Sequence, residues 1–452
     1  MRRFLGWVYS IIVILGVLLG VAGLAVTPAR TTLRVLSFKD GHALAVQSLL
    51  PRFEAATGIS VQLDLVPAPS VAAKVLTDQS GGAHYDVYLV DEPYLPQLAP
   101  FLLPHAEWPD VTGAAGSAEF VAPAAAASSF RGKSYGLPVN GNIYLYVYRK
   151  DLFEDPAEKA AFHKRYGVPL EPPQDLASFE RIAAFFHRPP SLYGFAPFTR
   201  SSEGTTVEML WILGLTGVRV FDDRMNVVAR PEAIADALKT YRQLMSFAPP
   251  GSRMWHHAER MRAYARGLVA QIMTWPSFLR DLENPSKSLV VGESAYGARS
   301  AGTAAARPPG SSGGSGGGSL ESAGVAGTWI VTIARHTSKA RAAAQFAQWW
   351  ASSPDTAELL RRGMNPARRD VLSDQSLAQQ YPWFAATLEG FAHAQVRPRT
   401  NRYAQLSRLM SATFTAAVTA EGSPDSCDHC SSLAVELVAA LRGELNDNGV
   451  AK

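Results

Sequence analysis

The sequence lacks most of the features that would place it in a familiar functional class. Among 452 residues there are only two cysteines, so neither a disulfide framework nor a four-cysteine metal site can form. The formal net charge is only +4 and the basic residues are scattered, which excludes the continuous basic surface that nucleic-acid binding needs. No P-loop, HExxH helix or nucleophile elbow is found. These absences argue against an enzyme, and we predict no catalytic residue, cofactor or metal ion.

The two cysteines, Cys427 and Cys430, lie near the C-terminus in the stretch SCDHCS. In an exported chain such a pair forms a local disulfide or stays as two thiols, and the sequence leaves both open. His429 and the cysteine pair supply too few ligands for zinc. A thioredoxin-like motif would open a helix early in a βαβ unit, so the late position argues against redox chemistry.

The N-terminus departs from the pattern of a soluble chain. Arg2 and Arg3 precede FLGWVYSIIVILGVLLGVAGLAV, and no further charge occurs before Arg30. A basic start followed by roughly twenty apolar residues is typical of an export signal and is also long enough to span a bilayer. Residues 1–29 are therefore a cleaved signal peptide or a retained transmembrane anchor, and no cysteine follows for lipid attachment. In both cases the two arginines favour a cytoplasmic N-terminus, which places the rest of the chain on the periplasmic or extracytoplasmic side of the membrane.

The region after residue 30 alternates strands with helices. TLRVLSF (32–38) and ISVQLDLV (59–66) are rich in β-formers, and between them apolar residues recur at helical spacing up to Gly58. A third short strand, YDVYLV (85–90), ends just before Asp91. This order predicts an α/β fold with a parallel sheet, in which ligands bind at the carboxyl ends of the strands. Those ends are residues 38–41 and 91–94.

The rest of the chain divides into a helical part and a loop. Residues 150–290 are expected to be mainly helical, with Pro231 in the first turn of one helix. RPPGSSGGSGGGS (307–319) contains no side chain that can form a core, so it predicts a flexible loop within a domain. The segment that follows, VAGTWIVTIA, is expected to form a strand.

One stretch poses a choice between a hairpin and a cleft. In YGLPVNGNIYLYVYRKDLF (135–153), a proline and an Asn-Gly-Asn triplet lead directly into six apolar or aromatic residues. The preceding FRGKS is too short and too polar to be the partner strand of a hairpin. Tyrosines alternate here with Ile143, Leu145 and Val147, which indicates a strand buried on both faces. A polar entry to such a strand favours a cleft.

Four stretches, taken in order, resemble the extracytoplasmic solute-binding proteins of ABC importers, in the maltose-binding-protein-like sugar-binding family 1. LLPRFEAATGISVQLDLVP is similar to the first helix and second strand of that family, and YDVYLVDEPYLPQLAPFLLP to the third strand and the next helix. YGLPVNGNIYLYVYRKDLFED resembles the crossing between lobes. GTWIVTIARHTSKARAAAQFAQWWASSPDTAELLRRGMNPARRDVLSD resembles a late strand, helix and turn. The missing lipobox, the Gly/Ser insertion and the CxxC are departures from the family pattern.

The resemblance implies an α/β, two-lobed periplasmic-binding-protein type II fold with interlobe hinge crossings. The first lobe is expected to comprise residues 30–139 and 297–351, and the second lobe residues 140–296 and 352–452. Val139–Asn142 is then a hinge crossing whose polar backbone faces the cleft. Trp349 and Trp350, on one helical stripe with Phe346, are expected in the core.

A sugar needs paired donors and acceptors for its hydroxyls and aromatic rings for its apolar faces. Mapping the cleft edges of the family onto this sequence gives the candidate ligand-binding residues Asp40, Asp91, Glu92, Asn140, Asn142, Trp275, Trp329 and Arg368. Other roles stay open: the tryptophans can be core residues, Asp91 a helix cap, the asparagines turn formers, and Arg368 a brace for its turn. Glu203 and Trp211 are weaker candidates, and Asn365 is expected beside Arg368.

The resemblance implies that the chain is the extracytoplasmic substrate-binding component of an ABC importer. It would capture a sugar or sugar derivative and deliver it to permease subunits in the membrane, as a monomer and without nucleic acid. The alternative is a membrane-anchored ligand sensor that reuses the same fold, which a retained N-terminal helix would favour.

Overall fold

A computed structural model describes residues 30–82, 84–110, 119–297, 324–352, 355–420 and 427–446. The apolar N-terminal segment and the Gly/Ser run at 307–319 lie outside these ranges. Across the described ranges, none of the helices combines the length and the apolar character needed to cross a membrane.

The first sheet has five strands in the order β2-β1-β3-β10-β6. These are β1 (Thr32–Phe38), β2 (Ser60–Val66), β3 (Val87–Asp91), β6 (Gly136–Asn140) and β10 (Trp329–Ile333). The first three strands run parallel, as the alternating pattern predicts, whereas β10 is antiparallel to both β3 and β6. Helices of this lobe are α2 (Gly41–Thr57), α3 (Val71–Gly81), α4 (Leu95–Leu98), α5 (Ala122–Ala127) and α14 (Ala340–Ser352), with the short pair β4 (Ser129–Phe130) and β5 (Lys133–Ser134). We call this part the first lobe.

Local signals explain why α2 begins and ends where it does. The Asp40 side chain accepts a hydrogen bond from the backbone N–H of Ala43 at 2.8 Å, which caps the N-terminus. Gly58 then adopts φ 73° and ends the helix, a conformation that glycine reaches without steric cost. The predicted end of this helix is therefore confirmed.

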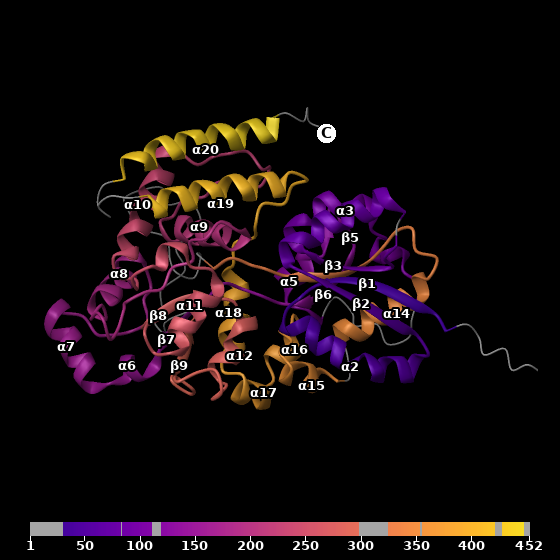
Figure 1. The fold of residues 1–452 in the computed structure, drawn as a ribbon, viewed down its shortest axis with the longest axis horizontal. Helices are drawn as coiled ribbons and strands as arrows, with labels where there is room; N and C mark the ends of the chain where they lie inside the picture. Colours follow the sequence, from indigo (N-terminus) through magenta and orange to yellow (C-terminus); the bar gives the residue numbers. More distant parts are fainter. Residues whose placement is uncertain are drawn as a thin grey trace, which may run out of the picture.

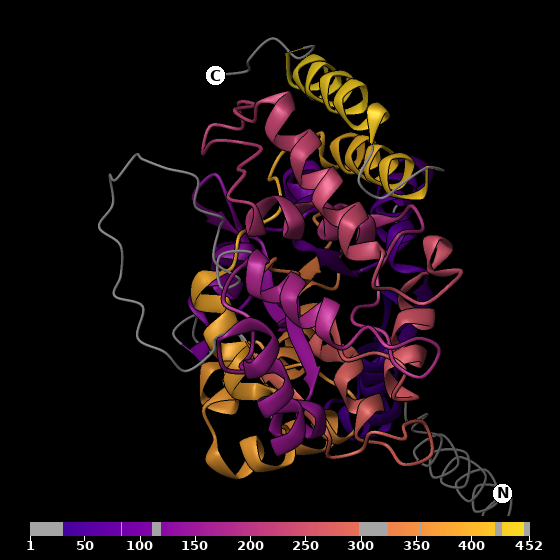
Figure 2. The same ribbon diagram turned by 90° about the vertical axis from the view of Figure 1, so that its left-hand side faces the viewer.

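The second sheet is smaller and entirely antiparallel. Its strands are β7 (Leu145–Arg149), β8 (Gln271–Thr274) and β9 (Ser294–Gly297), in the order β8-β7-β9. The surrounding helices are α6 (Lys150–Glu154), α7 (Pro156–Tyr166), α8 (Leu176–Phe185), α9 (Glu203–Leu215), α10 (Pro231–Met245), α11 (His257–Ala265), α12 (Leu279–Leu282), α19 (Tyr403–Thr419) and α20 (Asp428–Asn446). Figure 1 shows this second lobe beside the first, and Figure 2 shows α10, α19 and α20 grouped at one end of the molecule. The helix predicted to start at Pro231 is confirmed as α10.

Four helices late in the chain connect the two lobes along one side of the molecule. They are α15 (Thr356–Arg361), α16 (Arg369–Leu372), α17 (Gln375–Gln380) and α18 (Phe384–His393) (Figure 1). α15 lies against α2, whereas α18 packs against β7. The exact residue bounds of the lobes stay a prediction.

Three segments pass between the lobes and lie side by side. Residues 141–144 lead from β6 of the first sheet to β7 of the second. Isolated bridges pair Ile143 with Ala326 and Val325 with Gln395, so the crossings at 141–144, 324–328 and 394–397 form one narrow ribbon. β6 and β7 do not pair with each other. The cleft interpretation of the 135–153 stretch is therefore confirmed and the hairpin is excluded.

The two faces of β7 pack into different cores, as the alternating residues predict. Leu145 and Val147 belong to the cluster that continues into the first lobe, whereas Tyr146 belongs to the helical cluster of the second lobe. Trp350 is buried and Trp349 packs against Phe53 with ring centroids 5.1 Å apart. Cys427 and Cys430 form a disulfide at the start of α20, which decides between the two states that the sequence left open.

Candidate ligand-binding site

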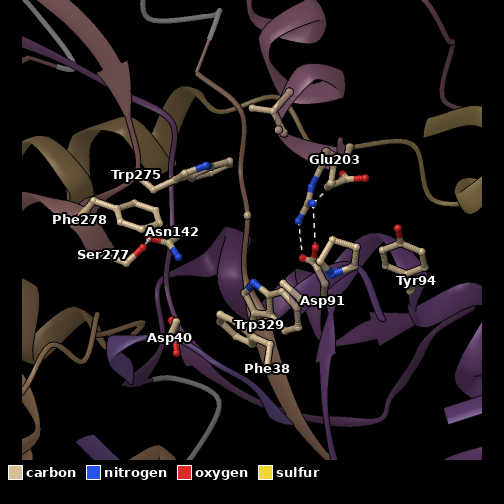
Figure 3. Close-up of a pocket in the computed structure, with 16 residues that line it drawn as sticks. Phe38, Asp40, Asp91, Tyr94, Asn142, Glu203, Trp275, Ser277, Phe278 and Trp329 are labelled. Atoms are coloured by element: carbon tan, nitrogen blue, oxygen red, sulfur yellow. Dashed lines mark hydrogen bonds and ion pairs between the residues drawn. The ribbon is translucent and has the colours of Figure 1, made fainter. Parts of the chain in front are cut away.

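A cavity of about 170 Å³ lies between the two lobes, next to the crossing ribbon. Figure 3 shows side chains reaching into it from both sides. The lining comprises Phe38, Asp40, Ala68, Pro69, Asp91, Tyr94, Asn142, Glu203, Gly204, Val207, Trp275, Ser277, Phe278, Gly327, Trp329 and Arg397. The carboxyl ends of β1 and β3 supply Phe38, Asp40 and Asp91, in agreement with the strand-end rule.

Aromatic rings form two walls of this cavity. Trp329 is 8% exposed and stacks on Phe38 with ring centroids 3.9 Å apart. Trp275 follows β8 and packs on Tyr144 with centroids 5.1 Å apart. The faces of such rings suit the C–H surfaces of a sugar or a cation.

The crossing at 141–144 contributes an amide network. Asn365 donates to the Oδ1 of Asn142 at 2.6 Å, and Ser277 donates to the same atom at 3.3 Å. Asn142 in turn donates to Asn140 at 3.1 Å. The Asn140 amide nitrogen is buried and finds no partner among the described residues. The network fixes the orientation of Asn142 toward the cavity.

Asp40 has two roles, because it caps α2 and also lines the cavity. Burial raises the pKa of its carboxyl to about 7, although the backbone N–H groups of Ala43 and His42 act in the opposite direction. No side chain of the described residues hydrogen-bonds to this carboxyl. Asp40 is thus a partly buried acid that borders the cavity without a side-chain partner among the described residues.

A buried ion-pair cluster centred on Arg397 forms the opposite part of the lining. Arg397 lies in the third crossing, is 3% exposed, and donates from both terminal nitrogens to Asp91, with the Nη1–Oδ2 distance 2.9 Å. It also donates to Glu203 of α9 at 3.0 Å and to Glu92 at 3.3 Å. Asp91 and Glu92 belong to the first lobe and Glu203 to the second, so one guanidinium connects both lobes and the crossing.

The cluster holds more acids than bases. Burial raises the pKa of Glu92 to about 7, and the Arg397 charge counteracts that effect. Burial likewise raises the pKa of Glu203, whose oxygens accept hydrogen bonds from Tyr403 and Ser407. The second carboxyl oxygen of Glu92 is buried and makes no hydrogen bond to the described part of the chain.

With this geometry in hand, comparison with known proteins decides the family. The model of the bacterial extracellular solute-binding protein family matches residues 48–386. The chain belongs to this family. The predicted resemblance is thereby confirmed, and membership of a family of solute-binding proteins makes the chain a binding protein, not an enzyme.

Several relatives share most of their length with this solute-binding protein. A probable amino-acid ABC transporter periplasmic-binding protein of Sinorhizobium fredii is 24% identical over 380 residues, 82% of this chain and 80% of the relative. The solute-binding protein of an ABC transporter from Agrobacterium radiobacter, solved with ribitol, gives a TM-score of 0.74 at 17% identity over 91% of this chain and 98% of that one. The protein from Agrobacterium vitis, solved with D-mannitol, gives 0.73 at 17% identity over 93% and 100%. At these identities the solved structures establish the two-lobed fold.

The structure of this solute-binding protein brings five of the eight predicted site residues to one cavity: Asp40, Asp91, Asn142, Trp275 and Trp329. Asp91 does not cap the following turn with its side chain, because that side chain binds Arg397. Glu92 lies directly behind Asp91 against Arg397, and Asn140 touches the cavity only through Asn142. Whether these residues bind ligand stays a prediction.

Arg368 does not line the cavity. Its guanidinium pairs with Asp370 at 2.7 Å and with Glu119 at 3.4 Å, which matches the alternative role of bracing a turn. The weaker candidate Trp211 is fully buried in the helical core of the second lobe. Glu203, the other weaker candidate, does line the cavity.

Sequence reasoning missed Arg397, Tyr94, Phe38 and Phe278. Arg397 lies in QVRPRTNRY, a stretch without periodicity, and its partners are more than 190 positions away in the chain. Phe38 and Tyr94 carried a usable signal, because both lie at the strand ends that were predicted to form the rim.

Gly327 allows the close approach of Trp275 to the second crossing. A Cβ at this position would lie 2.7 Å from the Trp275 ring, which is closer than van der Waals contact permits. We expect Gly327→Ala to displace that ring and weaken ligand binding about tenfold, while the protein still folds. Gly443→Ala is the matched control, because nothing lies within 4 Å of its Cβ. Titration of ligand followed by tryptophan fluorescence measures both variants, and equal affinities would contradict the close-packing argument.

Glu92 should make stability depend on pH. A carboxyl of pKa about 7 in the folded state and about 4.3 in the unfolded state binds more protons when folded, so its contribution to stability falls as pH rises from about 4 to 7. Glu92→Gln removes this dependence. We expect the variant to gain about 1–3 kcal/mol relative to the unmodified protein between pH 5 and pH 8. Urea unfolding at both pH values measures the difference, and a constant difference would mean that Glu92 is ionised throughout.

Proposed function

We propose that this chain is the substrate-binding component of an ABC importer, and that it holds a sugar or polyol in the interlobe cavity and delivers it to membrane permease subunits. The observation that carries the proposal is the cavity itself, which combines the Trp275 and Trp329 rings with Asp40, Asn142 and Ser277. Hydroxyl groups of the ligand would meet the polar side chains while its C–H faces lie on the rings.

The state of Arg397 favours carbohydrate over amino acid as the ligand. An amino acid brings a carboxylate, which needs a cation with N–H groups to spare. Arg397 is the one cation among the described lining residues. Four of its five N–H groups already donate to Asp91, Glu92 and Glu203. The relative from Sinorhizobium is named for amino acids, whereas the proteins from Agrobacterium were solved with ribitol and mannitol.

Binding would close the lobes about the three crossings. A ligand that touches residues of both lobes has more contacts in a closed form, and it therefore shifts the population toward that form. We propose that a monomer in this closed form docks on the permease. Residues 1–29 would export the chain, and retention of this segment as an anchor would favour the sensor alternative.

A thermal-shift screen tests the proposal. The panel contains sugars, polyols and amino acids, because a ligand that binds only the folded protein raises the melting temperature. We expect at least one sugar or polyol to raise it at millimolar concentration, with no response to amino acids. A response to amino acids alone would overturn the carbohydrate proposal.

A further inference from the structure

The charges that line the cavity are unequal. Asp40, Asp91 and Glu203 supply three carboxylates, and Arg397 supplies one guanidinium. No lysine and no second arginine of the described chain lines this space. The N-termini of α2 and α9 adjoin the cavity and contribute about half a positive charge each. The balance is negative when all three acids are ionised. Burial raises the pKa of Asp40 to about 7, so a cation placed beside this carboxyl would also favour its ionised form.

Arg397 has only one N–H group left over, too few for the paired hydrogen bonds that a carboxylate ligand would need. A guanidinium has five N–H groups, and four hydrogen bonds to Asp91, Glu203 and Glu92 already use this one. The acids of the cluster are equally engaged, since both oxygens of Asp91 bind Arg397 and both oxygens of Glu203 accept hydrogen bonds. Asp91 and Glu203 are therefore fully engaged within the cluster, and Glu92, whose second oxygen has no partner among the described residues, lies behind them and does not line the cavity.

Asp40 differs from the other two carboxylates. Its partners are backbone N–H groups of the first turn of α2, and no cation pairs with it among the described residues. In Figure 3 it stands apart from Asp91 and Glu203, with Trp329 between them, and it shares the cavity with the rings of Phe38 and Trp275. A carboxylate that faces a cavity with aromatic walls suits a positively charged group, because ring faces also attract cations.

We propose that the cavity selects a ligand that carries a protonated amine, such as an amino sugar or an amine-bearing polyol, and that Asp40 receives the ammonium group. This inference rests on the proposed carbohydrate function. It narrows the ligands from sugars and polyols in general to those that carry a positive charge. The neutral parts of the ligand would lie on Trp275 and Trp329, and acid-bearing sugars would be rejected by the unpaired negative charge.

Isothermal titration calorimetry of the purified full-length protein tests this selection. The ligands are used in sets of three, each with a neutral, an amine-bearing and an acid-bearing member. D-glucitol, D-glucamine and D-gluconate share one carbon chain and differ only in a hydroxyl, an amine or a carboxylate at one end. Galactose, galactosamine and galacturonate, with the corresponding gluco series, extend the test to rings. We expect the amine member of a binding trio to bind at least about tenfold more tightly than the neutral member, and the acid member to be the weakest.

Asp40→Asn is the decisive variant, because asparagine is of equal size and still caps a helix. We expect it to reduce the amine-to-neutral affinity ratio to within about threefold. Asp223→Asn makes the same chemical change at an exposed ion pair that does not line this cavity, and it should leave the ratio as it was.

The outcomes separate this inference from the proposed function. Neutral sugars that bind as tightly as their amine counterparts would overturn the amine selection and leave the carbohydrate function standing. An amine preference that survives Asp40→Asn would overturn the role of Asp40. Absence of binding by every amine member also counts against the inference, and binding of amino acids alone would remove the carbohydrate function as well.

Discussion

Replacing Arg397 by methionine should lower the free energy of unfolding by about 3–5 kcal/mol. The guanidinium is buried among Asp91, Glu92 and Glu203, and its loss removes the one cation that forms an ion pair with these acids among the described residues. Removal of one partner from a buried pair costs far more than the pair itself contributes, because the stranded charge has no water to solvate it. Urea unfolding at pH 8, where the acids favour their ionised form, measures the full effect.

Two further variants make this prediction specific. Arg219→Met breaks an ion pair with Asp223 in which both side chains are more than half exposed, and it should change stability by less than about 0.5 kcal/mol. Asp91→Asn, combined with Arg397→Met, removes one stranded charge and should restore part of the loss. If the double variant is no more stable than Arg397→Met alone, the unpaired acid is not the cause.

Replacing Trp275 by alanine should weaken binding of the carbohydrate found in the screen by about 30- to 1,000-fold. The ring lines the cavity, packs on Tyr144, and lies against the backbone of the second crossing at Gly327. Its removal deletes one wall and admits water to the polar side chains that would otherwise meet the ligand. Isothermal titration measures the affinity, and Trp275→Phe should recover part of it.

Loss of stability has to be separated from loss of the binding surface. Trp349→Ala is the matched control, because this half-buried tryptophan packs on Phe53 and Phe346 in the first lobe and does not line the cavity. We expect it to cost about 2 kcal/mol of stability without a change in ligand affinity. Equal losses of affinity in both variants would show that Trp275 acts through folding and not through contact.

Local signals were enough to predict most of the secondary structure. The start and end of α2 are set by the cap residues Asp40 and Gly58, and the start of α10 by Pro231. These effects depend only on neighbouring residues. The alternation around Leu145 and Val147 likewise predicted a strand with two covered faces. The antiparallel insertion of β10 between β3 and β6 was not predicted, because strand pairing across the sequence leaves no periodic signal.

The site was predictable only where the parallel-sheet rule or the family pattern applied. Asp40 and Asp91 follow strands whose ends must share one edge, so their proximity to a cavity could be expected. Arg397 could not be found this way, because its position depends on three chain crossings that only the complete fold brings together. Arg368 lies outside the cavity lining and pairs with its near neighbour Asp370, which agrees with the turn-bracing role that the sequence left open, whereas its second partner, Glu119, is far away in the chain.

The position of β10 also affects how the chain is made. β3 and β6 each pair with β10, yet its residues follow the entire β7–β9 segment in the sequence. During synthesis from the N-terminus, the larger sheet therefore lacks its fourth member until residue 333 has left the ribosome. The strand edges of this unfinished sheet would stay open to chaperones for most of translation. A translocation channel that accepts only unfolded polypeptide would thus meet a chain that has not yet been able to close its first lobe.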